Sequence, residues 1–105
     1  MAVAKSGTTV VGHLAGAQDS GFFKMQLAPG AALTAHLDVP AGSDFDLYIY
    51  NSNGTLIAKS ENGAGLADEI KVTNTGTSTF TRYVRVAYYQ GGSGASAPYQ
   101  LKLVW

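Results

Sequence analysis

The sequence contains no cysteine, few charged residues and no long hydrophobic run. The lack of cysteine excludes a disulfide framework, a thiolate zinc site and a thiol nucleophile. Seven basic residues balance seven acidic ones, and only 13% of residues are charged, so no strong field would attract nucleic acid or an anionic membrane. No apolar stretch has the length of a signal peptide core or a membrane span. We therefore expect no nucleic-acid partner and no membrane partner.

Helical periodicity is also missing. No segment repeats apolar residues at helical spacing over the length that a helix needs. Clusters of Gly, Asn and Ser instead recur after about every ten residues, a spacing typical of an all-β sandwich or barrel. The chain has 105 residues, which is enough for one domain. We expect a single domain over residues 1–105, cut from a longer precursor.

The clearest strand pattern lies at residues 42–51. Its two faces alternate as follows: Phe45, Leu47 and Ile49 on one, and Asp44, Asp46, Tyr48 and Tyr50 on the other. A period of two predicts a strand with one buried face and one face that is exposed or lies at a sheet edge. The turn pair Asn53-Gly54 follows, and because both residues tolerate positive φ it predicts a hairpin to the next strand.

Other segments show β-branched residues or the same alternation between turn clusters. In total we expect eight strands, at 8–14, 22–27, 32–39, 42–51, 55–60, 68–73, 81–89 and 99–104. The Cys-Trp-Cys pattern of antibody domains is absent. Eight short strands without it favour a jelly-roll-like β-sandwich of two antiparallel sheets.

Phenolic side chains gather on two of the expected strands. If the strands are neighbours in one sheet, five side chains could form a binding face for an insoluble protein or polysaccharide: Tyr48, Tyr50, Tyr83, Arg85 and Tyr89. Tyrosine offers a large, stiff contact area at low entropic cost. The alternative is that each Tyr only pairs across strands, because it is a good sheet residue.

Four acidic residues are candidates for a calcium site: Asp44, Asp46, Asp68 and Glu69. Calcium takes six to eight oxygen ligands, and loop carbonyls could supply the remainder. A structural role is favoured, in which the strand-start carboxylates accept backbone N–H groups and Arg85 pairs with one acid across the sheet.

The sequence contains no recognisable catalytic motif. His13 and His36 are the only imidazoles, and neither lies in a metal-binding pair or a nucleophile motif. The glycine-rich residues 91–94 precede a strand, so they lack the helix N-terminus of a phosphate loop. We expect no enzymatic activity.

Five motifs occur in order: Asp44 to Tyr50, Asn53-Gly54, Glu69-Ile70, Tyr83 to Val86, and Tyr99 to Leu101. In sequence and order they resemble the bacterial pre-peptidase C-terminal domain. That family has an Asp-x-Asp-Leu-Tyr-x-Tyr strand, a turn with Gly, a Glu-x-Ile strand, a Tyr-Val-Arg-Val strand that enters a Gly-rich loop, and a closing Tyr-x-Leu strand. The match is close over the last two thirds of the chain and looser before it.

The resemblance implies a non-catalytic β-sandwich domain at the C-terminus of a secreted, extracellular bacterial peptidase. Its partners would be the catalytic domain of that peptidase and an insoluble substrate polymer. In the alternative, the domain is a removable pro-segment that assists folding or secretion and has no ligand. The similar collagen-binding domains of collagenases hold calcium through an acid-rich N-terminal segment. Residues 3–7 of this chain contain no acid.

Overall fold

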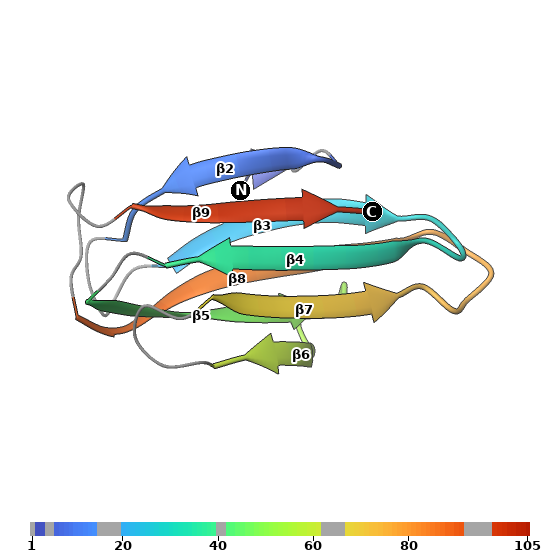
Figure 1. Ribbon diagram of the computed structural model, residues 1–105. Helices are drawn as coiled ribbons and strands as arrows, with labels where there is room; N and C mark the ends of the chain where they lie inside the picture. The colour runs from blue at the N-terminus through green and yellow to red at the C-terminus, as the bar shows by residue number, and fades with distance from the viewer. Residues whose placement is uncertain (1, 4–5, 15–19, 40–41, 62–66, 92–97) are drawn as a thin grey trace.

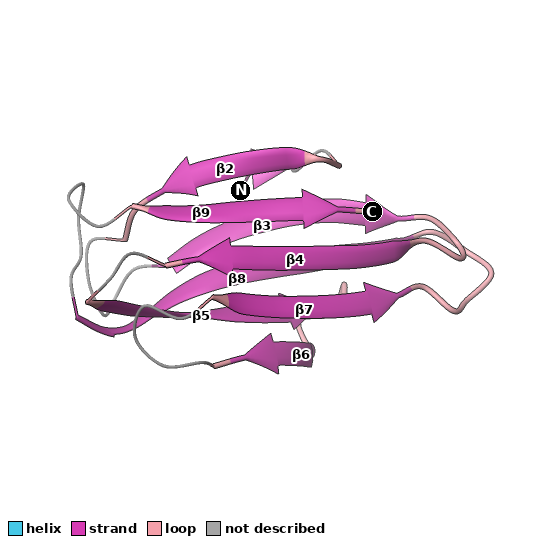
Figure 2. Ribbon diagram, viewed as in Figure 1, coloured by secondary structure: helices cyan, strands magenta, loops and turns pink. Residues whose placement is uncertain are grey.

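The computed structural model describes residues 2–3, 6–14, 20–39, 42–61, 67–91 and 98–105. Their secondary structure is all strand, as Figure 2 shows, so nothing in the described ranges is a helix that could cross a membrane. The nine strands are β1 (Ala2–Val3), β2 (Thr8–Gly12), β3 (Ser20–Leu27), β4 (Ala32–Asp38), β5 (Ser43–Tyr50), β6 (Leu56–Ser60), β7 (Asp68–Thr73), β8 (Phe80–Gly91) and β9 (Tyr99–Val104).

The strands form two sheets that face each other across the core (Figure 1). The first has the order β1-β3-β8-β5-β6 and the second the order β2-β9-β4-β7. All pairings are antiparallel except the short parallel pair of β1 with β3. Without β1, each sheet takes four strands from both halves of the chain in the order of a jelly roll. The predicted all-β sandwich is therefore confirmed.

Each of the eight expected strands corresponds to one of β2 to β9, with ends that differ by up to two residues. The additional strand, β1, was not predicted, because its two residues are too few to give a periodic signal in the sequence. The hairpin after β5 is also present: Gly54 has a φ of 87°, and its amide donates to the carbonyl of Asn51. The turn predictions at 15–19, 40–41, 62–65 and 92–96 lie outside the described residues.

The core consists of the inward side chains of both sheets. Phe45 lies at its centre, fully buried, with ring centroids 5.9 Å from Tyr88 and 6.2 Å from Tyr99. The alternation predicted for β5 is correct on this face, because Leu47 and Ile49 are also fully buried. Similar alternation in β3, β4 and β9 completes a single apolar layer between the sheets.

A β-bulge separates the two ends of the β5–β8 pair. Asp44 pairs with Gln90 and Phe45 pairs with Tyr88, so Tyr89 has no partner position in β5. An extra residue of this kind increases local twist and turns neighbouring side chains. The prediction of an exposed or edge face is wrong for Asp44 and Asp46, which are each only 5% exposed.

Candidate functional site

The outer face of the first sheet carries two rows of paired side chains. In one row Phe22 of β3 lies opposite Arg85 of β8, which lies opposite Tyr48 of β5. In the next row Tyr83 of β8 lies opposite Tyr50 of β5. Because these residues alternate with the core residues of their strands, all five lie on the same side of the sheet. We call Phe22, Tyr48, Tyr50, Tyr83 and Arg85 the aromatic face.

Arg85 occupies the middle of the aromatic face. Its guanidinium carbon lies 5.6 Å from the ring centroid of Phe22 and 5.7 Å from that of Tyr48. Its Nε donates to Ser20 Oγ at 3.0 Å, and its Nη1 donates to the Tyr50 hydroxyl at 3.3 Å. The expected ion pair of Arg85 with an acid does not form among the described residues. Cation–π contacts and neutral acceptors instead fix the position of the guanidinium.

Tyr48 is held from the other side by the edge of the sheet. Its hydroxyl donates to Glu61 Oε2 at 3.0 Å, and Glu61 Oε1 also pairs with Lys59 Nζ at 2.8 Å. Burial and the bond to Glu61 raise the pKa of the Tyr48 phenol well above its usual range. The phenol therefore remains a neutral hydrogen-bond donor over the whole pH range in which proteins normally function.

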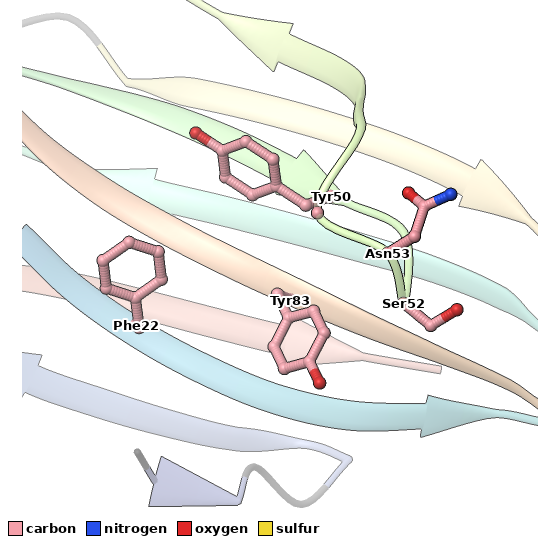
Figure 3. Close-up of a pocket in the computed structure, with 6 residues that line it drawn as sticks. Phe22, Tyr50, Ser52, Asn53 and Tyr83 are labelled. Carbon is pink, nitrogen blue, oxygen red and sulfur yellow. The ribbon is translucent and has the colours of Figure 1, made fainter.

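An open hollow of about 550 Å³ lies on the aromatic face, beside Tyr50 and Tyr83. Its lining residues, shown in Figure 3, are Phe22, Tyr50, Ser52, Asn53, Gly54 and Tyr83. The three rings come from three adjacent strands, and the polar groups come from the turn that follows β5 (Figure 3). Among the described residues the lining is mostly aromatic, with no charged side chain and a few hydroxyl and amide groups, which is a common composition for a binding site.

The structure brings four of the five predicted binding residues together: Tyr48, Tyr50, Tyr83 and Arg85. Tyr89 lies apart from them, since the bulge places it beside Asp44 and Asp46 with 65% of its surface exposed. Phe22 was not predicted as a binding residue, although in the sequence it alternates with Phe23 and Met25, which are buried in the core. Its place next to Arg85 depends on the pairing of β3 with β8, which local sequence does not reveal.

The predicted acidic candidates separate into two places. Asp44, Asp46 and Asp68 are buried near one end of the first sheet, and Asp68 Oδ1 accepts a 2.7 Å bond from Ser60 Oγ. Glu69 lies on the outer face of the second sheet, where it contacts His36. The capping role expected for Asp44 is not seen for its Oδ1, which has no hydrogen-bond partner among the described residues.

Burial and mutual repulsion raise the pKa values of Asp44 and Asp46. Desolvation raises the pKa of Asp46 to about 6, and the charges of Asp44, Asp68 and Glu61 act in the same direction. Desolvation also raises the pKa of Asp44, followed by the charge of Asp68. Within the described ranges, no three His, Cys, Asp or Glu side chains are already close enough to hold a metal ion.

The two histidines lie away from the aromatic face. His13 is exposed just beyond β2. His36 bridges Glu69 Oε2 at 3.0 Å and Asp38 Oδ1 at 3.1 Å, and the bond to Glu69 is the main reason that its pKa is raised. Neither histidine is placed beside a hydroxyl nucleophile in the described contacts, so this geometry gives no support to a hydrolytic centre.

The fold is similar to that of several solved structures of bacterial proteins. The pre-peptidase C-terminal domain of collagenase from Bacillus anthracis has a TM-score of 0.76 at 14% identity, over 97% of this chain and 92% of that one. The Yersinia pseudotuberculosis-derived mitogen has a TM-score of 0.68 at 16% identity, over 92% and 83%. The periplasmic inhibitor of g-type lysozyme from Aeromonas hydrophila has a TM-score of 0.59 at 11% identity, over 98% and 93%.

No protein-family model and no curated protein matches the sequence. The likeness to the solved structures is one of fold, and at that level the resemblance to the pre-peptidase C-terminal domain is confirmed. The three similar proteins have different printed roles, so the shared sandwich does not by itself assign a function.

Proposed function

We propose that this chain is a non-catalytic accessory domain of a secreted bacterial peptidase and that its aromatic face holds an insoluble substrate polymer. The observation that carries the proposal is the convergence of Phe22, Tyr50 and Tyr83 around an open, uncharged hollow. These rings come from three paired strands, so the sheet keeps them in fixed relative positions. Such preorganisation lowers the entropic cost of binding.

The shape of the site favours an extended ligand. The hollow opens to the surface, and the aromatic face continues from it to Arg85 and Tyr48. A chain molecule could contact both rows at once, whereas a small ligand would fill only the hollow. Aromatic rings contact apolar ridges of a protein fibre or a polysaccharide, and the phenol and amide groups at the rim donate and accept hydrogen bonds.

The remaining partner is the catalytic domain of the parent peptidase, and the setting is extracellular. The likeness in fold to a collagenase pre-peptidase C-terminal domain supports both parts of the proposal. Residues 1–105 would act as one domain that increases the local concentration of the enzyme on its substrate. Such tethering raises apparent affinity without any new contact at the active site.

Co-sedimentation with insoluble collagen, chitin and cellulose tests the proposal. Wild type should pellet with at least one polymer, and the double variant Phe22→Ala with Tyr83→Ala should lose at least about tenfold in affinity, since two aromatic contacts are removed. Tyr89→Ala is the matched control, because it removes an exposed Tyr outside the aromatic face.

Wild type that pellets with none of the polymers would contradict adhesion and leave the removable pro-segment as the better account. That alternative has its own support, because the polar groups of Tyr48 and Arg85 already bond within the sheet, as in a purely structural face. A double variant that pellets like wild type would move the binding surface elsewhere.

A further inference from the structure

A second pocket lies at the bulge, separate from the aromatic face. Its volume is about 300 Å³, and its lining residues are Asp44, Asp46, Glu61 and Tyr89. We call these four residues the acidic pocket. Asp44 and Asp46 are each 5% exposed, and the fully buried Asp68 lies close enough to raise the pKa of both. Three carboxylates are therefore withdrawn from water in one region.

Among the described residues, no cation acts on the pKa of Asp44 or Asp46. Every charged group that shifts the pKa of Asp44 or Asp46 is another carboxylate. The ammonium group of Lys59 pairs instead with Glu61 at 2.8 Å, on the exposed edge of the sheet. Carboxylates that lie this deep in a protein are normally paired with a cation or coordinate a metal ion, because desolvation without compensation is costly.

The side chain of Asp44 gives a second, independent indication that the pocket binds a cation. Its Oδ1 is buried and has no hydrogen-bond partner among the described residues, although the residue lines the pocket. A carboxylate oxygen is an acceptor only, so a protein that buries one without a donor pays the full desolvation penalty. A bound cation would remove that penalty.

We propose that the acidic pocket is a calcium site, with the carboxylates of Asp44 and Asp46 as the anionic ligands and Glu61 and the Tyr89 hydroxyl at its mouth. Calcium is favoured over a softer metal because the described lining residues offer only oxygen atoms as side-chain ligands. The bulge creates the site, since it places Tyr89 of β8 beside the start of β5. The proposal is independent of polymer binding by the aromatic face.

The same geometry sets the expected affinity. Since no three acidic side chains are already gathered at ligand spacing in the described ranges, neutral oxygens and water must complete the shell. Calcium sites of low ligand charge in extracellular modules have dissociation constants of about 10⁻⁴ to 10⁻³ M. We expect this weak range.

Thermal unfolding near neutral pH tests the site on the whole chain. Calcium chloride at about 10 mM should raise the melting temperature by about 4 °C or more, and magnesium chloride at equal ionic strength should raise it less. The double variant Asp44→Asn with Asp46→Asn should fold and lose the calcium response, because it keeps the shape and removes the charge. Glu69→Gln, on the other sheet, should respond like wild type.

Terbium luminescence gives a second readout that does not depend on stability. Tyrosine sensitises terbium at short range, so wild type should show emission that calcium displaces, and Tyr89→Phe should weaken that emission. A wild type without a calcium response beyond the magnesium control would overturn the proposal. Retention of the response in the Asp44→Asn with Asp46→Asn variant would overturn it as well.

Discussion

The guanidinium carbon of Arg85 lies 5.7 Å from the ring centroid of Tyr48, directly across the β5–β8 pair. The same guanidinium lies 5.6 Å from the Phe22 ring on the other neighbouring strand. One cation thus joins side chains from three strands, and within the described residues it makes no ion pair with an acid, although Tyr48 donates to Glu61 at the edge of the face. This arrangement keeps the face flat and aromatic instead of ionic, and it is the basis of the proposed polymer binding.

Arg85→Lys should lower the free energy of unfolding by about 1 to 2 kcal/mol. Lysine keeps the charge but cannot donate in fixed directions to both Ser20 Oγ and the Tyr50 hydroxyl, and it stacks less well on aromatic rings. Urea unfolding measures the change. The matched control is Lys71→Arg at an exposed position of β7, which should stay within about 0.5 kcal/mol of wild type. Equal stability of the two variants would show that Arg85 has no positioning role.

Gly12→Ala should destabilise the sandwich by about 1 to 3 kcal/mol. A Cβ at this position would lie 2.7 Å from the hydroxyl of Tyr99, whose ring is held in the core at 4% exposure. Addition of Tyr99→Phe should recover part of the loss, because it removes the oxygen that the new methyl group meets. Losses that simply add in the double variant would contradict this close approach.

Asn74→Ala should cost about 2 to 4 kcal/mol, since one buried amide connects three backbone groups. Its Nδ2 donates to the carbonyls of Leu27 and Ser78 at 2.8 Å, and its Oδ1 accepts from the amide of Gly76 at 2.9 Å. Chemical denaturation measures the effect. The exposed neighbour Thr75, changed to Ala, should shift stability by less than about 0.5 kcal/mol. A small effect at Asn74 would mean that water replaces these bonds.

The stability of the metal-free protein should fall as the pH rises through about 6. Folding raises the pKa of Asp46 from 3.8 to about 6, so the folded state binds the proton more tightly than the unfolded state. The resulting stabilisation is full below pH 3.8 and is lost above the folded pKa, and it amounts to at most about 3 kcal/mol. Urea unfolding in EDTA between about pH 4 and pH 8 measures the slope.

Asp46→Asn isolates this contribution. The raised pKa values of Asp44, which is buried, and of His36, whose protonated form is held by Glu69, have the same sign, so wild type alone would not separate the three groups. Asp44 and His36 are present in both proteins, and the difference between their profiles therefore reports Asp46. Parallel profiles for wild type and Asp46→Asn would show that Asp46 does not titrate with folding.

Much of the fold could be predicted from the sequence because it depends on short-range signals. The alternation around Phe45 predicted β5 and its buried face, and Asn53-Gly54 predicted the hairpin that follows. The predicted site required β5 and β8 to be neighbours in one sheet, but the sequence did not show that they pair. This pairing gathers Tyr48, Tyr50, Tyr83 and Arg85. It is a long-range contact, and the structure supplies it.

The bulge was not predictable from the same signals. Residues 84–89 alternate regularly, so Tyr89 was expected beside Tyr83 and Arg85. The position of Tyr89 depends on which residue of β5 it faces, and the extra residue is visible only after the two strands are paired. The burial of Asp44 and Asp46 also depends on long-range contacts that the local pattern does not contain. A local pattern can show that a carboxylate alternates outward, but it cannot show what then covers it.

Chemical footprinting on the bound polymer tests the central claim most directly, namely that the aromatic face is the surface that holds the ligand. The domain is iodinated at tyrosine while free and while bound to a polymer on which it sediments, and each site is quantified by mass spectrometry. The account predicts protection of Tyr50 and Tyr83 in the bound state and unchanged modification of Tyr89, which is 65% exposed outside the face. Protection of Tyr89 with continued modification of Tyr50 and Tyr83 would contradict it.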